Sequence, residues 1–238
     1  MKKLLVIFFI AVLSGIPSYG DNLNSFFGEA DVFFKTYVKD GKVNYKSIKT
    51  NFHEIERLYL IVKEVDLTGL TENEVKAFYI NAYNLCVIYQ VSKYYPLKSA
   101  MDQSGFFDKV KHSVAGEEMT LNYLEIKYLL MKYRDPRIHF ALACAAVSCP
   151  KLASFAYMPE SLDSELRRRT ELALNDGLFI RVGNGIVEIS KIFEWYKDDF
   201  TSGSSTVLQF INSYRKTKIA ATSKVTYYEY DWSLNELN

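Results

Sequence analysis

A histidine and two cysteines lie close together in the middle of the chain. His139 is followed by Cys144 and Cys149 in the segment HFALACAAVSC. An imidazole beside a thiol activates the cysteine as a nucleophile, because the ring takes up the thiol proton. The spacing therefore indicates acyl transfer on a peptide or amide substrate through a thioester, with His139 as the base and Cys149 as the nucleophile.

The residues around these side chains predict how they are positioned. Pro150 follows Cys149, and proline favours the first turn of a helix. We therefore expect a helix to begin at Pro150 with Cys149 as its N-cap, where the helix dipole and free N–H groups stabilise a thiolate. Residues 137–143 alternate in the manner of a strand, which would carry His139.

Two alternatives use the same three residues. A disulfide between Cys144 and Cys149 would remove the nucleophile, and such bonds are common in exported proteins. His139 and both cysteines could instead be ligands of a zinc ion, although their spacing matches no common zinc motif and a fourth ligand is not evident. We expect no metal, and the chain lacks phosphate-loop and dinucleotide patterns, so no cofactor is expected either.

Polar residues in apolar segments are further candidates. Asn81 and Asn84 lie three residues apart in a strongly apolar stretch, so on a helix they share a face. They either wall a site or tie loop backbone to the helix. Glu125 lies among apolar residues at helical spacing, where a carboxylate is either paired or raised in pKa. We expect Asn84 or Glu125 to orient the His139 ring, and Asn81 to contact substrate.

The first half of the chain is predicted to be largely helical. Apolar residues recur at helical spacing in four segments, residues 23–37, 46–64, 72–94 and 121–133. The third of these begins with a capping box at Thr71 and Glu74 and is apolar nearly all round, which predicts a buried helix with Cys86 in the core. His53 and His112 lie in polar stretches and are expected to be exposed.

The second half alternates helices and strands. Two strands are expected at residues 178–182 and 186–190, because Gly183-Asn184-Gly185 between them is a strong hairpin signal. The other expected elements are helices at residues 160–175, 191–199 and 205–217, and a last strand at 225–230. No linker or repeat divides the chain. We therefore expect one α+β domain over residues 21–238, with a helix-rich N-terminal half packed on a small, mostly antiparallel sheet.

The composition is that of an ordinary globular protein. The 238 residues are 49% hydrophobic and 24% charged, so a disordered chain is excluded. Lys and Arg number 29 against 28 Asp and Glu, which gives a net charge of +1. Binding to nucleic acid without sequence preference needs a basic stripe, and none is visible, so no nucleic-acid partner is expected.

Residues 1–20 have the pattern of a secretory signal peptide. Lys2 and Lys3 precede an apolar run, and Ser18 and Gly20 are small residues at the expected cleavage site. No other stretch is apolar enough to cross a membrane. The protein is therefore expected to be periplasmic or extracellular, with no transmembrane segment after cleavage.

Several segments together carry a family resemblance. They are AFYINAYNLCVIYQV (77–91), DPRIHFALACAAVSCPKL (135–152), IFEWYKDDF (192–200) and YDWSLN (230–235), with further similarity over residues 41–45 and 116–125. In this order they resemble the family known as domain of unknown function 547. The resemblance implies a distant relation to papain-like and transglutaminase-like cysteine hydrolases, and hence a core of that type. The family name itself assigns no activity.

The resemblance also implies a set of site residues. The positions that match the family pattern are Asn81, Asn84, Glu125, His139, Cys144, Ser148, Cys149, Pro150 and Trp232. Ser148 and Trp232 thereby become candidates for substrate binding, whereas Ala143 departs from the pattern, which has asparagine or a similar residue there. Family members inside cells keep both cysteines, which argues against a purely structural disulfide. The alternative function is a non-catalytic domain of the cell envelope, either structural or binding a peptide or glycan.

Overall fold

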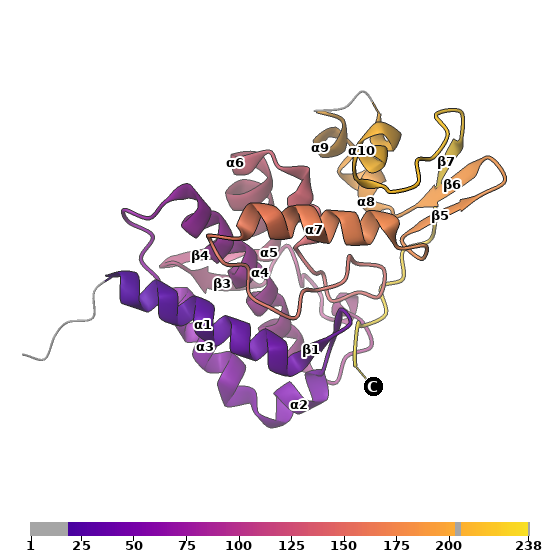
Figure 1. Ribbon diagram of the computed structural model, residues 1–238. Coiled ribbons are helices and arrows are strands. Elements are labelled where there is room, and N and C mark those ends of the chain that lie inside the picture. Colours follow the sequence, from indigo (N-terminus) through magenta and orange to yellow (C-terminus); the bar gives the residue numbers. More distant parts are fainter. Residues whose placement is uncertain (1–18, 203–205, 238) are drawn as a thin grey trace, which may run out of the picture.

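Helices form most of the regular structure, and short strands form the rest (Figure 1). The computed structural model describes residues 19–202 and 206–237. Residues 1–18 of the predicted signal peptide therefore lie outside the described residues. The α-helices are α1 (Tyr19–Tyr37), α2 (Tyr45–Thr50), α3 (Phe52–Glu64), α4 (Glu72–Tyr94), α5 (Leu121–Tyr123), α6 (Met131–Tyr133), α7 (Leu162–Asn175), α8 (Ile192–Trp195), α9 (Lys197–Thr201) and α10 (Val207–Tyr214). None of the helices within the described ranges is long and apolar enough to span a membrane.

The strands form three small sheets. They are β1 (Val38–Lys39) with β2 (Lys42–Val43), β3 (Lys111–Val114) with β4 (Glu117–Thr120), and β5 (Ile180–Gly183) with β6 (Ile186–Ile189) and β7 (Lys224–Tyr227). All pairs are antiparallel except β6 with β7. The predicted α+β class and the mostly antiparallel pairing are confirmed, with the strands divided among three sheets instead of one.

The two strongest local sequence signals formed as expected. The side chain of Thr71 accepts a hydrogen bond from the Glu74 N–H at 3.3 Å, and the Glu74 carboxylate accepts from the Thr71 N–H at 2.7 Å, which completes the capping box of α4. Every residue from Lys76 to Ile88 of this helix is buried. In the β5–β6 hairpin, Asn184 and Gly185 both adopt positive φ, as a two-residue type I′ turn requires.

Two predicted helices differ in detail from the helices of the structure. The helix expected over residues 46–64 is divided at Asn51, whose side-chain amide donates to the Ser47 carbonyl at 3.2 Å and competes with the helical hydrogen bonds. The segment expected over residues 121–133 is helical throughout, but it is wound as a π-helix over η2 (Leu124–Leu130).

The predicted strand over residues 137–143 was wrong. His139 lies instead in a 3₁₀-helix, η3 (Pro136–Phe140). The Asp135 carboxylate caps this helix by accepting from the Arg137 N–H at 3.1 Å, and Pro136 supplies a helical φ in its first turn. An alternating run this short does not distinguish a strand from a helical turn.

The helix predicted to begin at Pro150 was also wrong. The chain runs without regular structure from Cys149 to the start of α7. Its backbone is bound by side chains from other elements: Asn81 of α4 donates to the Tyr157 carbonyl at 2.8 Å and accepts from the Tyr157 N–H at 2.9 Å. These bonds hold the segment extended against α4, so Cys149 is not a helix N-cap.

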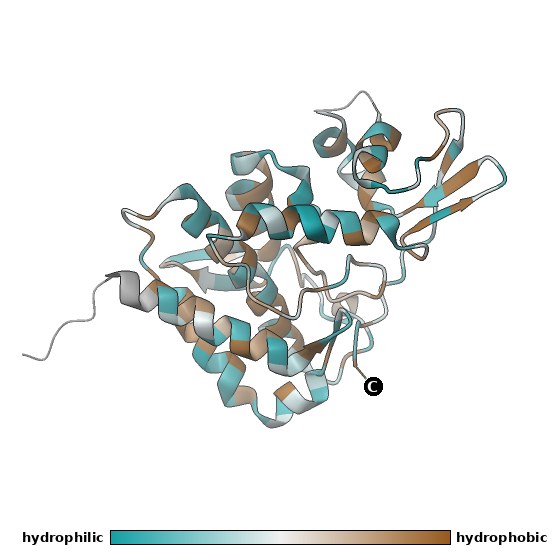
Figure 2. Ribbon diagram, in the orientation of Figure 1, coloured by the Kyte–Doolittle hydropathy of each residue, from teal (hydrophilic) through white to brown (hydrophobic). Residues whose placement is uncertain are grey.

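The buried apolar side chains form two clusters, which we call the first and the second core. The first core is formed by α1 to α5, by η2 and by the loop that follows η3. The second core joins α8, α9 and α10 to the β5–β6 hairpin. Helix α7 spans both, since Leu162 and Leu166 pack in the first core and Leu174 in the second. Hydrophilic and hydrophobic residues alternate along its ribbon (Figure 2). The boundary between the two cores is where the candidate site lies.

His112 is buried, whereas its polar sequence context predicted exposure. It lies on β3, which packs against α3, and only 3% of the residue is exposed. Its Nε2 donates to the Gln90 side-chain oxygen at 2.6 Å, because the Gln90 amide nitrogen already donates to the Phe106 carbonyl. Burial, with a smaller effect of the Lys93 charge, lowers the pKa of His112 from 6.5 to about 4. The ring is therefore neutral at physiological pH.

This burial predicts a specific acid sensitivity. Between pH 6.5 and about 4, a histidine in the unfolded chain takes up a proton that the folded protein excludes. His112 should therefore make its full contribution to the free energy of unfolding above pH 6.5. About 3 kcal/mol of that contribution should be lost as the pH falls to 4. Urea denaturation over this range should show the loss in the wild type and in the exposed-site control His53→Gln. An equal loss in His112→Gln would contradict the assignment.

Candidate functional site

A pocket of about 220 Å³ opens at the boundary of the two cores. Tyr83 of α4 contributes to its lining from the first core, and Ile192 of α8 contributes from the second. Among the residues singled out from the sequence, those that line the pocket are Glu125, His139, Cys144, Cys149, Pro150 and Trp232. The structure therefore brings the predicted imidazole and sulfur atoms to one cavity.

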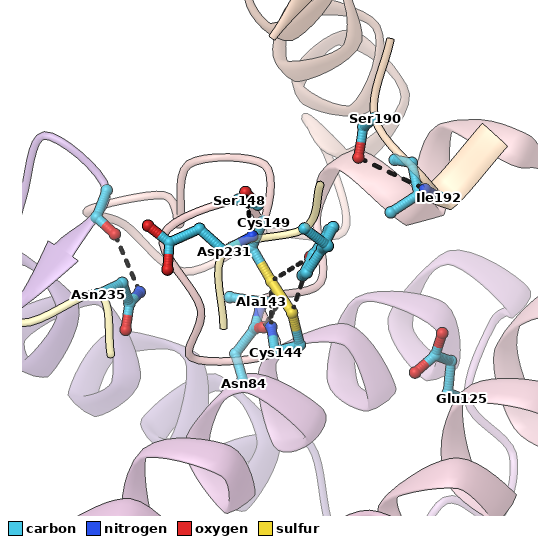
Figure 3. Close-up of a disulfide and its surroundings, with 12 residues drawn as sticks. Asn84, Glu125, Ala143, Cys144, Ser148, Cys149, Ser190, Ile192, Asp231 and Asn235 are labelled. Carbon is cyan, nitrogen blue, oxygen red and sulfur yellow. Dashed lines mark hydrogen bonds between the residues drawn. A yellow bond between two sulfur atoms is a disulfide. The ribbon is translucent and has the colours of Figure 1, made fainter. Parts of the chain in front are cut away.

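Cys144 and Cys149 are joined by a disulfide, with their Cα atoms 6.2 Å apart (Figure 3). The backbone N–H of Cys144 donates to the Cys149 sulfur at 2.9 Å, and the Tyr230 hydroxyl donates to the same sulfur at 3.3 Å. Tyr230 also lies 3.1 Å from the Cys144 sulfur. In this oxidised state Cys149 has no free thiol, so it cannot act as a nucleophile. The remaining cysteine, Cys86, is free and buried, and burial raises its pKa above the usual range.

The loop that carries the two cysteines is held from two sides. From α4, the Asn84 amide donates to the Ala141 carbonyl at 2.9 Å. It also accepts from the Ala143 N–H at 2.9 Å (Figure 3). From the C-terminal segment, residues 231–235 bind the loop backbone through hydrogen bonds that include Val147 N–H to the Ser233 carbonyl at 2.9 Å. Asn84 therefore positions the cysteine loop and does not contact the imidazole.

His139 is hydrogen-bonded to Asp199 of α9, a residue that the sequence analysis did not single out. The His139 Nε2 lies 2.8 Å from the Asp199 Oδ2. The His139 side chain is 4% exposed, and that of Asp199 is 37% exposed. A carboxylate only accepts hydrogen bonds, so Nε2 carries the proton and Nδ1 holds the lone pair of the neutral ring. Asp199 thus fixes the tautomer in which Nδ1 is the basic atom.

Two aromatic rings hold the imidazole in place. Tyr196 and Phe200 lie with their ring centroids 4.4 Å and 5.0 Å from that of His139. The Tyr196 hydroxyl donates to one oxygen of Glu125 and the Tyr83 hydroxyl donates to the other, each at 2.9 Å. Burial, and then the Glu125 carboxylate, raises the pKa of both tyrosines well above the usual range, so both remain neutral donors. Glu125 therefore contacts Tyr196 and not His139. The carboxylate that contacts His139 is that of Asp199.

Aromatic side chains form one wall of the pocket. Tyr230 packs against Trp195 and Trp232 with centroid distances of 4.9 Å and 4.8 Å, and the two tryptophans lie 6.0 Å apart. The ring centroid of Trp232 also lies 6.4 Å from that of Phe107. Such a wall offers flat apolar surface with a few polar edges, which suits a peptide chain or the face of a sugar ring. Trp232 therefore lines the pocket, and its role in substrate binding stays a prediction.

The other two substrate-binding candidates lie elsewhere. Asn81 is fully buried, its amide is shared between the Tyr157 backbone and the Ala77 carbonyl, and it does not line the pocket. It ties loop backbone to the helix, which was the second role considered for it. The Ser148 hydroxyl accepts from the Asp231 N–H at 2.9 Å, and Ser148 lines a neighbouring cavity instead.

The zinc alternative finds no geometric support. Across residues 19–202 and 206–237, no three His, Cys, Asp or Glu side chains are grouped so that they could hold a metal ion. The sulfur atoms of Cys144 and Cys149, two of the three ligands considered, are bonded to each other.

The residues missed by sequence reasoning come mainly from the last third of the chain. Asp199, Tyr196 and Trp195 lie in the segment IFEWYKDDF, and the signal that could have identified them is a pair of aspartates beside aromatic residues. Such a pair on a short helix resembles an ordinary solvated surface. What distinguishes Asp199 is its contact with His139, which is 60 residues away in sequence.

A family model matches the part of the chain that contains several of these site residues. Residues 67–172 match a family model described as "Protein of unknown function, DUF547". That range contains His139, both cysteines, Asn84 and Glu125, and it ends before α8 and α9. No curated protein and no solved structure matches the chain. The papain-like or transglutaminase-like core implied by the resemblance stays a prediction.

Proposed function

We propose that this chain, which belongs to the DUF547 family, is an exported cysteine hydrolase or acyltransferase that acts on a peptide or amide after its disulfide has been reduced. The observation that carries the proposal is that His139, which is hydrogen-bonded to Asp199, lines the same pocket as Cys149. A buried imidazole with its tautomer fixed by a carboxylate is the arrangement that cysteine and serine nucleophiles use. The pattern of residues 1–20 supports export.

The first step is exchange with a dithiol reductant. One thiolate of the reductant attacks a protein sulfur to form a mixed disulfide, and its second thiol displaces that sulfur. The reductant leaves as a disulfide, and Cys144 and Cys149 become thiols. The N–H of Cys144 and the hydroxyl of Tyr230 both donate toward the Cys149 sulfur, and such donors favour the thiolate over the thiol.

The second step is acyl transfer. His139 takes the Cys149 proton at Nδ1, and the sulfur attacks the substrate carbonyl carbon, so a C–S bond forms. The imidazolium then gives its proton to the departing amine as the C–N bond breaks. Water, activated by the same Nδ1, hydrolyses the thioester and releases an acid; a second amine in place of water gives a transferred product. Asp199 stabilises the imidazolium throughout.

The test is the dependence of turnover on reduction. A panel of p-nitrophenyl esters and peptide p-nitroanilides should be hydrolysed by the protein treated with dithiothreitol and not by the oxidised protein. Cys86→Ala is the matched control, because Cys86 is buried away from the pocket and its loss should not change this dependence. Folded, reduced protein that turns over no member of the panel would contradict the proposal.

A second candidate is non-catalytic binding of a peptide or glycan in the same pocket. The wall of Trp195, Tyr230 and Trp232 favours it, because stacked aromatic rings bind such ligands without any chemistry. Titration of the oxidised protein with oligosaccharides and short peptides, followed by tryptophan fluorescence, distinguishes the two. Tight binding that is equal in oxidised and reduced protein, together with absent turnover, would favour this candidate.

A further inference from the structure

A second cavity, of about 390 Å³, lies beside the first. Cys149 and Pro150 line both cavities, so this pair of residues forms the wall between them. Other lining residues come from η3, from the segment around the two cysteines, from α7 and the residues between α7 and β5, from β5, and from Tyr228 after β7. A ligand in the second cavity would therefore lie next to the sulfur atom that attacks in the proposed reaction.

Apolar side chains form the floor and much of the rim of this cavity. Phe140 and Phe179 are buried members of the second core. Val147, Leu172 and Leu178 line the cavity and are exposed, and Leu178 has 77% of its surface accessible. Exposed apolar residues around a concavity indicate a surface that gains stability when an apolar ligand covers it.

The charged residues of the cavity carry an excess of positive charge. Lys151, Arg169 and Arg181 line it, against one carboxylate, Asp176, which pairs with Lys151 at 2.9 Å. Arg181 pairs with Glu188, which does not line the cavity. Arg169 donates one guanidinium N–H to the Lys151 carbonyl, and its buried Nε finds no acceptor among the residues that the structure describes. The cavity thus combines apolar surface with one cation, Arg169, that forms no ion pair with a carboxylate within the described residues, and this combination is complementary to an apolar carboxylate.

We propose that the second cavity binds the part of the substrate on one side of the reacting carbonyl, an apolar peptide segment that carries a carboxylate, with Arg169 as the main cation. The assignment as a substrate subsite rests on the proposed function, because that function places the reacting carbonyl at Cys149. Binding of such a segment does not require a free thiol, so it is measurable in the oxidised protein.

The experiment compares N-acetyl-Leu-Leu bearing a free carboxylate with the same dipeptide as its C-terminal amide. Calorimetric titration of oxidised wild-type protein should give binding about tenfold tighter for the carboxylate, the contribution of one charge-assisted hydrogen bond. Arg169→Gln should remove the preference. Arg167→Gln is the matched control, because Arg167 lies on the same helix, is exposed and pairs with Glu171 outside the cavity. Thermal melting of each variant checks the fold.

Arg181→Gln provides a second variant, since Arg181 is half-exposed and its replacement should reduce the preference without disturbing α7. Equal binding of both probes, or an unchanged preference in both Arg169→Gln and Arg181→Gln, would overturn the subsite. The two proposals fail separately. A carboxylate preference without turnover by the reduced protein would refute the hydrolase, whereas turnover that ignores the carboxylate and Arg169 would refute only the subsite.

Discussion

Replacement of Cys149 by serine is expected to abolish turnover under reducing conditions, whereas replacement of Cys144 by serine should make the protein active without any reductant. In Cys149→Ser the attacking sulfur is lost, and the expected decrease in kcat is on the order of 10⁶-fold, as for the removal of another covalent nucleophile. In Cys144→Ser the partner that blocks Cys149 is lost, while the Cys144 N–H and the Tyr230 hydroxyl still face the sulfur. Rates for the best ester or anilide substrate, with and without dithiothreitol, measure both effects.

The two variants control for each other. Each removes the same disulfide, whose short loop contributes about 2 kcal/mol to the free energy of unfolding by chain entropy. Urea denaturation should therefore show nearly equal destabilisation of the two proteins, so that a difference in activity is not a difference in folding. Equal activity of Cys144→Ser and Cys149→Ser would show that the sulfur takes no part in the reaction.

Replacement of His139 by alanine is expected to lower kcat/KM of the reduced protein by about 10³-fold, the usual contribution of a positioned acid–base group. In the proposed mechanism the ring supplies both the base for the thiol and the acid for the departing amine, and Asp199 is its hydrogen-bond partner. Steady-state kinetics in the Cys144→Ser background avoids any dependence on reduction. Because His139 packs against Tyr196 and Phe200, the free energy of unfolding must be measured alongside.

Asp199→Asn provides the graded comparison for this prediction. An asparagine oxygen can still accept from the His139 Nε2–H, but it carries no charge to stabilise the imidazolium. Asp199 is partly exposed, so water replaces some of the lost interaction and the decrease in rate should be smaller than that of His139→Ala. Asp199 is a positioning residue in this account, and a shift in the pH dependence of kcat/KM should accompany its loss. Full activity of His139→Ala would contradict the assigned base.

The sequence pattern correctly predicted the elements that are stabilised by interactions between residues close together in the chain. The capping box of α4 and the Asn184-Gly185 turn depend on backbone geometry within a few residues, and both formed as expected. The predicted proximity of His139 to the cysteines was also correct at the level of one pocket. Short segments whose backbone bonds to distant partners were less predictable. Pro150 begins no helix because the following chain is bound by α4, an interaction that sequence spacing does not reveal.

The assignment of roles within the site shows the same division. Asn84 and Glu125 were recognised as polar groups in apolar segments, which is a property of the sequence alone. Their partners were not recognised, because Asn84 binds loop backbone and Glu125 binds two tyrosine hydroxyls that come from different elements. The sequence around Asp199 is typical of a solvated surface, but in the structure α9 packs against η3. Residue type indicated the chemistry, and tertiary packing decided which carboxylate serves the histidine.

The reactivity of Cys149 is the most direct test of the account. In the Cys144→Ser protein at pH 7, iodoacetamide labelling followed by peptide mapping gives the alkylation rate of Cys149, with a cysteine in a short unstructured peptide as the reference. The account predicts that Cys149 reacts at least about tenfold faster than the reference, because a thiolate is the reacting form, and that His139→Ala removes the advantage. Labelling no faster than the reference, or only after denaturation, would contradict it.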